Sequence, residues 1–253
     1  MWSLVVTLAS AVATLALLPM PVLAQASTVP RATDGKPDLS GFWRVMNSAA
    51  WDIQDHHAQW GVPAGQGVVE GNEIPYQPWA LAKKEENYKN RATADPETKC
   101  YLPGVPRLTY MGYPFQIVQS PSYIAILYEY VHAIRHVHLD RPEHPEGPLE
   151  FWLGDSRGRW DGDTLVVDVI HFNDQTWFDR AGNFHSEALH VVERYTPMGP
   201  DHINYEVTIE DSKVFTRPWK MRMILYRQKE PNFQLLEYEC FAFDEFRGLS
   251  TPR

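Results

Sequence analysis

Beyond residue 107, apolar and polar residues alternate along the chain in short runs separated by turn-forming residues. β-branched and aromatic residues dominate these runs. A period of two is typical of strands that bury one face. The strands expected from this pattern cover residues 115 to 120, 123 to 130, 132 to 140, 187 to 195, 203 to 210, 219 to 228 and 233 to 243, with a hairpin at 158 to 169.

The clearest turn signal is Asp161-Gly162, which lies between the two strand-like halves of residues 158 to 169. Asp and Gly tolerate the positive φ angles of a type I′ turn, whose twist matches the flanking strands. The pair therefore predicts a two-residue hairpin. Similar breaks at Pro121-Ser122, at residues 197 to 201 and at residues 229 to 232 indicate an antiparallel meander.

The pattern before residue 107 is different. Residues 38 to 45 predict a first short strand that begins near Gly41, and residues 46 to 75 show no sustained period. Helix formers follow Pro78, which a first helical turn tolerates. One short helix is therefore expected near residues 79 to 90.

These elements predict an all-β, mainly antiparallel protein with eight or more strands. Such a set forms either a lipocalin-like up-and-down barrel or two packed sheets. Closure is favoured because it removes the exposed edges of long aromatic strands. Gly41-Phe42-Trp43 resembles the Gly-x-Trp at the first strand of lipocalins. No linker or repeat divides residues 25 to 253, so they are expected to form a single domain.

Residues 1 to 24 carry no charged side chain and end in the small-x-small sequence Val22-Leu23-Ala24. This is typical of a signal peptide cut before Gln25. Pro19 and Pro21 interrupt the apolar run short of the roughly 20 residues that a membrane span needs. We therefore expect a periplasmic or secreted protein with no membrane span after cleavage.

The chain carries 32 acidic and 23 basic side chains, a net charge of −9. It shows no basic stripe of the kind that follows a phosphate backbone, so nucleic acid is not an expected partner. The only two cysteines are Cys100 and Cys240. In an oxidising compartment they are expected to form a disulfide, and the alternative is two separate buried thiols.

Several segments together identify a family resemblance. They are residues 76 to 80, 100 to 107, 172 to 174, 184 to 186 and 216 to 219, and above all Gly-Asp-Ser-Arg-Gly-Arg-Trp-Asp-Gly-Asp-Thr-Leu-Val-Val-Asp at 154 to 168. With them the chain resembles a large family of secreted bacterial proteins that carry a GDSxGxWxGDTLVVD signature. The resemblance spans nearly the whole chain after the signal peptide, and it implies secretion but no particular reaction.

The connection at residues 172 to 186 contains Asp174, Trp177, Asp179 and His185. Loops of this length in compact domains are usually functional or disordered, and aromatic residues argue against disorder. We expect the loop to cover a barrel mouth, with Asp174 orienting His185 as a general acid or base. The structural alternative is that Asp174 makes an Asx-turn and His185 caps the next strand.

In a continuous strand, His132, His136 and His138 would share one face, with Glu129 and Arg135 on the other. Three such imidazoles are compatible with Zn or Cu binding. The further ligands considered are His144, His171, His185 and Glu193. A His-rich exposed strand face is the simpler interpretation, and it needs no metal.

His190 and Arg194 would likewise share one strand face. Arg135 and Arg194 are expected either to neutralise Asp155 or Asp168, or to bind an anionic group of a substrate. Dinucleotide-binding, Walker-type and His-Glu-x-x-His motifs are absent from the sequence. Ser156 has Gly-x-Ser-x-Gly spacing, but it precedes a hairpin and not the helix of a nucleophile elbow.

The preferred hypothesis is a cofactor-independent enzyme of the lyase, hydratase or isomerase type, acting on a small, partly apolar or aromatic molecule. Such chemistry needs a base, an acid and a positioned cation. The alternatives are a lipocalin-like binding protein and a His-ligated metalloprotein. The candidate catalytic residues are His132, Arg135, Asp155, Asp174, His185 and His190, and the candidate substrate-binding residues are Tyr128, Trp160, Trp177 and Arg194.

Overall fold

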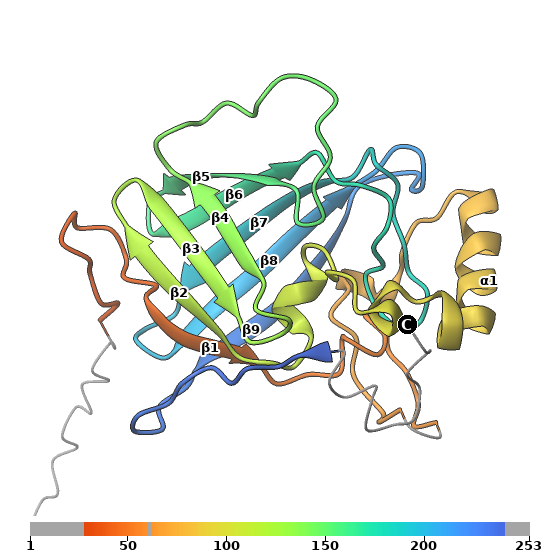
Figure 1. The fold of residues 1–253 in the computed structure, drawn as a ribbon, viewed down its shortest axis with the longest axis horizontal. Coiled ribbons are helices and arrows are strands. Elements are labelled where there is room, and N and C mark those ends of the chain that lie inside the picture. Colours follow the sequence, from red (N-terminus) through yellow and green to blue (C-terminus); the bar gives the residue numbers. More distant parts are fainter. Residues whose placement is uncertain (1–27, 60–61, 241–253) are drawn as a thin grey trace, which may run out of the picture.

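The computed structural model describes residues 28 to 59 and 62 to 240, which form a β-barrel with a helix beyond one end (Figure 1). The expected signal peptide lies outside the described residues. Among the residues described, no helix has the length and apolar character needed to cross a membrane. The strands are β1 (Gly41–Val45), β2 (Phe115–Ser120), β3 (Tyr123–Tyr128), β4 (Ile134–His138), β5 (Asp155–Asp161), β6 (Thr164–Ile170), β7 (His190–Pro197), β8 (His202–Glu210) and β9 (Trp219–Arg227).

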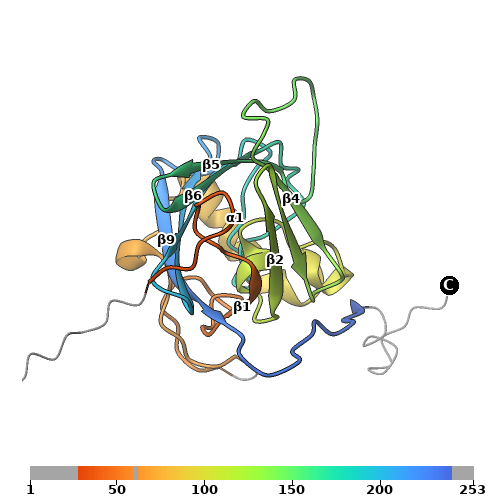
Figure 2. The same cartoon turned by 90° about the vertical axis from the view of Figure 1, so that its left-hand side faces the viewer.

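The nine strands form one closed ring, in which β1 pairs with both β2 and β9 (Figure 2). Trp43 of β1 lies opposite Phe115 on one side and Arg227 on the other. The expected all-β, lipocalin-like architecture is confirmed, as the barrel and not as two packed sheets. Strand order around the ring follows the order along the chain.

One strand pair is parallel, which corrects the expected antiparallel meander. β4 and β5 run in the same direction, with Val137 opposite Ser156. Parallel neighbours cannot be joined by a tight turn, so residues 139 to 154 return along the barrel before β5 begins. In Figure 1 this connection is the long green loop that rises above β4 and β5.

Side chains fill the interior of the barrel. In β7, burial alternates so that Val191, Glu193 and Tyr195 are buried between partly exposed residues. Trp43 and Tyr205 are also buried in the core, and the Trp43 indole donates a hydrogen bond to the Leu39 carbonyl at 2.8 Å. The period of two read from the sequence thus corresponds to the face that each strand turns inward.

Long connections cover the barrel end at which β2, β7 and β9 begin. The segment before β2 contains α1 (Pro78–Ala94) and the 3-10 helices η1 (Glu70–Asn72), η2 (Pro96–Lys99) and η3 (Arg107–Tyr110). Tyr110 donates a hydrogen bond from its hydroxyl to the Phe178 carbonyl at 2.9 Å. The Phe178 ring packs edge-on against Trp219, so the 171 to 189 connection is anchored over this end.

Three local predictions differ from the structure. Helix α1 continues to Ala94, past the expected end. The hairpin loop is Gly162-Asp163, one residue later than predicted, and only Gly162 has a positive φ, of 59°. Residues 233 to 240 form no strand beyond a single bridge between Tyr130 and Tyr238, while residues 241 to 243 of that predicted strand lie outside the described residues.

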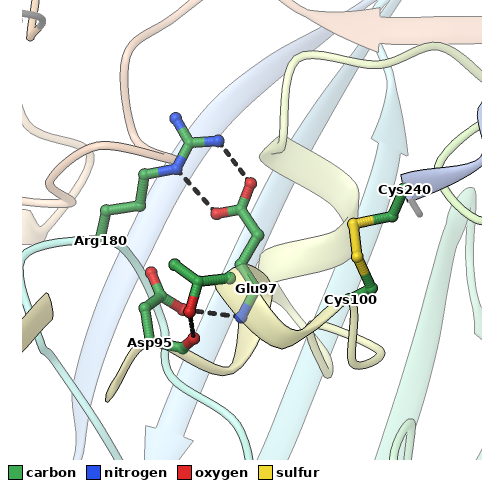
Figure 3. The surroundings of a disulfide bond; sticks show 6 residues. Asp95, Glu97, Cys100, Arg180 and Cys240 are labelled. Atoms are coloured by element: carbon green, nitrogen blue, oxygen red, sulfur yellow. Dashed lines mark hydrogen bonds and ion pairs between the residues drawn. A yellow bond between two sulfur atoms is a disulfide. The ribbon is translucent and has the colours of Figure 1, made fainter. Parts of the chain in front are cut away.

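The expected disulfide between Cys100 and Cys240 is present (Figure 3). It joins the residue that follows η2 to the C-terminal segment, across 140 positions of the sequence. The chain after β9 is therefore tied covalently to the helical segment beside the barrel.

A buried ion pair crosses the barrel interior between β4 and β7. Arg135 and Glu193 are 1% and 0% exposed and meet through two hydrogen bonds, one of 3.0 Å from Nη1. The hydroxyls of Tyr195 and Tyr205 donate to Glu193 Oε1 at 3.0 and 2.6 Å, and Arg135 Nε donates to Ser156 Oγ at 3.0 Å. Burial and the Glu193 charge raise the pKa of both tyrosines, so they remain donors.

Replacing one partner of this pair leaves the other charge buried and unpaired. We expect Arg135→Met to lower the free energy of unfolding by about 3–5 kcal/mol, measured by urea titration. Adding Glu193→Leu should recover much of that loss. The exposed pair between Arg194 and Asp161 is the control, and Arg194→Met should cost less than about 1 kcal/mol. Equal losses for the two arginines would contradict this account.

Candidate functional site

A chain of carboxylates and imidazoles crosses the outer face of β5 to β8. His144, from the connection at 139 to 154, lies between Asp155 and Asp168, with each ring nitrogen 2.9 Å from a carboxylate oxygen. The other oxygen of Asp168 is 3.0 Å from His190 Nε2. Glu210 continues the chain at 3.5 Å from His190 Nδ1. We refer to these five residues as the His-Asp array.

Strand register brings most of the array together. Asp155, Asp168 and His190 occupy outward positions of β5, β6 and β7, and the next residue of each strand is buried. His190 lies directly opposite Glu210 across β7 and β8, and Val192 lies opposite Asp168. His190 and Asp168 are therefore diagonal neighbours on one face, within reach of long side chains.

Hydrogen bonds shift the pKa values of the array in favour of the charged forms. The bond from His190, with a further bond from His144, lowers the pKa of Asp168 although burial opposes this. Burial also opposes ionisation of Asp155, but bonds from Arg157 and His144 lower its pKa. The bond to Asp168 raises the pKa of His190. His190 is thus favoured as an imidazolium next to ionised carboxylates.

A groove of about 330 Å³ lies beside the array and is lined by His190 and His171. His171 adopts a left-handed backbone, with φ of 61°, and its Nε2 is 3.0 Å from the Pro145 carbonyl. A carbonyl can only accept, so Nε2 carries a proton, and in the neutral ring Nδ1 keeps its lone pair. The remaining lining includes Leu149, Phe172 and Leu189, which make the groove partly apolar.

The structure brings together two of the predicted catalytic residues, Asp155 and His190, but not with the expected arginines. Arg135 pairs with Glu193 inside the barrel, and Arg194 pairs with Asp161 at 3.0 Å. Neither neutralises Asp155 or Asp168, which corrects that expectation. For Arg135 the reason is strand alternation, because it faces inward while Asp155 and Asp168 face outward. Arg194 faces outward, but it pairs with Asp161 at the opposite end of β5 from Asp155.

Asp174 does not orient His185. Asp174 is exposed and accepts a hydrogen bond of 2.5 Å from Gln175. His185 is 2% exposed, and its Nδ1 donates to the Ser186 carbonyl at 2.9 Å. Its Nε2 accordingly accepts from Thr176 Oγ1 at 2.6 Å. Burial lowers the pKa of His185, which favours the neutral ring.

His132, His136 and His138 do not form one strand face. Val131 and His132 have positive φ angles of 46° and 51°, so the chain turns there and β4 begins only at Ile134. His132 pairs with Glu239 at 3.1 Å. Within residues 28 to 59 and 62 to 240, no group of three or more His, Cys, Asp or Glu side chains is arranged to hold a metal ion.

The remaining candidates lie mostly in the core. Tyr128 is 3% exposed and Trp177 is 9% exposed. Trp160 is partly buried against the core, on an inward position of β5. Ser156 is 1% exposed and accepts from Arg135, so its Gly-x-Ser-x-Gly spacing marks a position inside a strand.

Asp179 is a fully buried carboxylate in the 171 to 189 connection. It accepts hydrogen bonds from the backbone of Ile53 at 2.9 Å, Ala181 at 2.9 Å and Asn183 at 3.1 Å, and from the Asn183 side chain at 2.5 Å. Burial and the charge of Asp52 raise its pKa to about 7. These bonds hold the loop against the segment that precedes α1, and we assign Asp179 a structural role.

A second and larger pocket, of about 1010 Å³, lies beside α1 and η2. We call it the α1 pocket. Arg180 lies at its wall and makes two hydrogen bonds to Glu97, at 2.7 and 2.5 Å (Figure 3). The tyrosines Tyr113, Tyr130 and Tyr238 form another part of the wall.

Sequence reasoning did not assign catalytic roles to His144, Asp168 or His171. It considered His144 and His171 only as metal ligands, and Asp168 only as a charge to be neutralised. The positions of Asp168 and His190 on neighbouring strands were a usable signal. For His144 no such signal exists, because the sequence of a long irregular connection does not indicate which strand face the connection covers.

Comparisons with protein-family models, with curated proteins and with solved structures find no match to this chain.

The array predicts a stability maximum in mildly acidic solution. Asp155 and Asp168, whose pKa values are lowered on folding, stabilise the fold above their unfolded pKa of about 3.9, and this is lost as the pH falls further. His190, whose pKa is raised, stabilises the fold below about pH 6.5, and this is lost as the pH rises through its folded pKa.

His190→Gln should therefore flatten the decline of the melting temperature above pH 6.5, as recorded by scanning calorimetry. His202→Gln, on the exposed start of β8, is the matched control and should leave the profile unchanged. An unchanged profile for His190→Gln would contradict the assignment of this decline to the His-Asp array.

Proposed function

We propose that the protein is a cofactor-independent acid–base enzyme, of the isomerase, lyase or hydratase type, that acts in the groove beside the His-Asp array. The observation that supports this is a pair of imidazoles lining the groove, one favoured as a proton donor and the other as a proton acceptor. His190 is favoured as the protonated acid, while the proton on Nε2 of His171 leaves Nδ1 as a base.

The proposed reaction moves one proton out of the substrate and one proton in. His171 Nδ1 removes a proton from a carbon next to a carbonyl group, and His190 donates a proton to the carbonyl oxygen or to a conjugated carbon. Asp168 holds the His190 ring through Nε2. The contact of His190 Nδ1 with the half-exposed Glu210 is long, at 3.5 Å, so a substrate oxygen can take its place.

The groove sets the substrate class. Its volume of about 330 Å³ suits a small molecule, and Leu149, Phe172 and Leu189 offer apolar contact. We therefore propose a small, partly apolar carbonyl compound as the substrate. The disulfide supports our proposal that the reaction takes place in the periplasm or outside the cell, where such bonds persist.

The same His-Asp array also has a structural effect, because His144 attaches the 139 to 154 connection to the barrel. His171 also holds this connection, through the Pro145 carbonyl, but that contact needs only the proton on Nε2 and no base at Nδ1. The proposal therefore needs a test that distinguishes loss of the base at His171 from loss of structural contacts.

The test is exchange of carbon-bound protons, which can be followed even while the natural substrate is unidentified. The protein is incubated in D₂O with a panel of small β,γ- and α,β-unsaturated ketones, and deuterium incorporation is followed by NMR. We expect at least one ketone to exchange or isomerise. His171→Gln and His190→Gln should each slow that rate by about 10²–10⁴-fold, because each removes one proton-transfer group.

His202→Gln should leave the exchange rate at the wild-type value, because His202 lies on β8 outside the groove. The urea midpoint of each variant is measured in parallel. Wild-type exchange in a folded His171→Gln variant would overturn the proposed role of His171, and no exchange with any ketone would overturn the substrate class.

A further inference from the structure

The α1 pocket carries an excess of positive charge, in contrast to the chain as a whole. Among the residues that the structure describes, five basic side chains line it against three carboxylates, while the whole chain has a net charge of −9. The basic residues are Lys84, Lys89, Arg91, Lys99 and Arg180, and the acidic ones are Asp52, Asp95 and Glu97. Such a pocket attracts anions from solution.

Two of the three carboxylates are already paired. The buried Arg107 makes two hydrogen bonds of 3.0 Å to Asp95 and one of 2.6 Å to Glu97. Arg180 holds both oxygens of Glu97 (Figure 3). Burial opposes ionisation of Glu97, but these two arginines lower its pKa. The third carboxylate, Asp52, interacts with Lys84, which leaves the other lysines of the pocket without a carboxylate partner among its described lining residues.

The guanidinium group of Arg180 has a second edge that does not bind Glu97. Its Nε and Nη2 bind Glu97, while Figure 3 shows the remaining nitrogen pointing away from that carboxylate. The side chain is 29% exposed, and the guanidinium lies 4.1 Å from the centre of the Trp51 ring. Stacking on Trp51 and pairing with Glu97 fix its plane, which suits it to bind an anionic group of a ligand.

Another part of the wall is aromatic. Tyr130 stacks on Tyr238 with ring centres 5.2 Å apart, and Tyr113 lies 5.4 Å from Tyr130. Tyr130 is 1% exposed, yet its hydroxyl has no hydrogen-bond partner among the residues that the structure describes. A buried hydroxyl without a partner is costly, and an acceptor on a bound ligand would satisfy it.

We propose that the α1 pocket is a binding site for a small aromatic carboxylate, separate from the groove beside the His-Asp array. The ring of the ligand packs against the tyrosines, and its carboxylate faces Arg180 and the lysines of α1. One oxygen of that carboxylate accepts a hydrogen bond from Tyr130.

Titration calorimetry with two probes of similar size tests this site. 2-Naphthoate is the anionic probe and 2-naphthylmethanol is the neutral one. We expect 2-naphthoate to bind at least tenfold more tightly, and its advantage to shrink in high salt. Equal affinities, or no binding of 2-naphthoate, would overturn the proposal.

Two sets of variants locate the binding. The double variant Lys84→Gln, Lys89→Gln changes one half-buried and one exposed residue of α1, and it should weaken 2-naphthoate about threefold to tenfold without affecting 2-naphthylmethanol. Tyr130→Phe should weaken 2-naphthoate by a similar factor. Because its hydroxyl has no partner among the described residues, Tyr130→Phe should leave the urea midpoint unchanged or raise it.

Tyr226→Phe, on β9 and outside this pocket, is the matched control and should leave 2-naphthoate binding unchanged. His190→Gln should leave it unchanged too, which separates this site from the proposed reaction. If folded Tyr130→Phe and the lysine double variant both bind 2-naphthoate as the wild type does, the assigned site is wrong.

Discussion

The odd number of strands in the closed barrel is the constraint on which the rest of this structure depends. A closed ring with an odd number of strands cannot be antiparallel throughout, and here the exception is the pair β4 and β5. A parallel pair requires a connection that travels back along the barrel. That connection supplies His144 to the His-Asp array and Leu149 to the wall of the groove. Both features are therefore consequences of how the barrel closes.

The interior of the barrel explains why the candidate sites lie outside it. Arg135 and Glu193 span the core with their hydrogen-bonding groups engaged by Ser156, Tyr195 and Tyr205. This buried charge pair gives the core a polar centre, unlike the apolar container that a lipocalin-like carrier uses. The two proposed sites lie on the outward faces of the strands and among the segments beside the barrel.

The sequence predicted most of the fold because strand alternation is a local property. Runs such as residues 115 to 120 and 203 to 210 show their inward faces directly. The parallel pairing of β4 with β5 is not local, and no residue in either strand indicates it. The turn at Val131 and His132 also escaped prediction, since β-branched Val rarely adopts a positive φ. That one turn removed His132 from the strand face expected for it.

The difference between regular strands and irregular connections also separates the site residues that were predicted from those that were missed. Asp155 and His190 come from regular strands, where position along the chain indicates the face. Asp174 and His185 come from an irregular connection, and their partners proved to be Gln175 and Thr176. The two residues share one connection and were expected to pair, but in an irregular loop the local backbone decides which side chains meet.

The disulfide has a consequence for how the barrel can open. The covalent loop from Cys100 to Cys240 contains eight of the nine strands, β2 to β9, and leaves β1 outside. β1 is short, and pairing and packing alone hold it between β2 and β9. The barrel is therefore expected to open first at β1. If β1 separates from β2 and β9, the other eight strands remain paired as one sheet, and the disulfide still links the two ends of the segment that contains them.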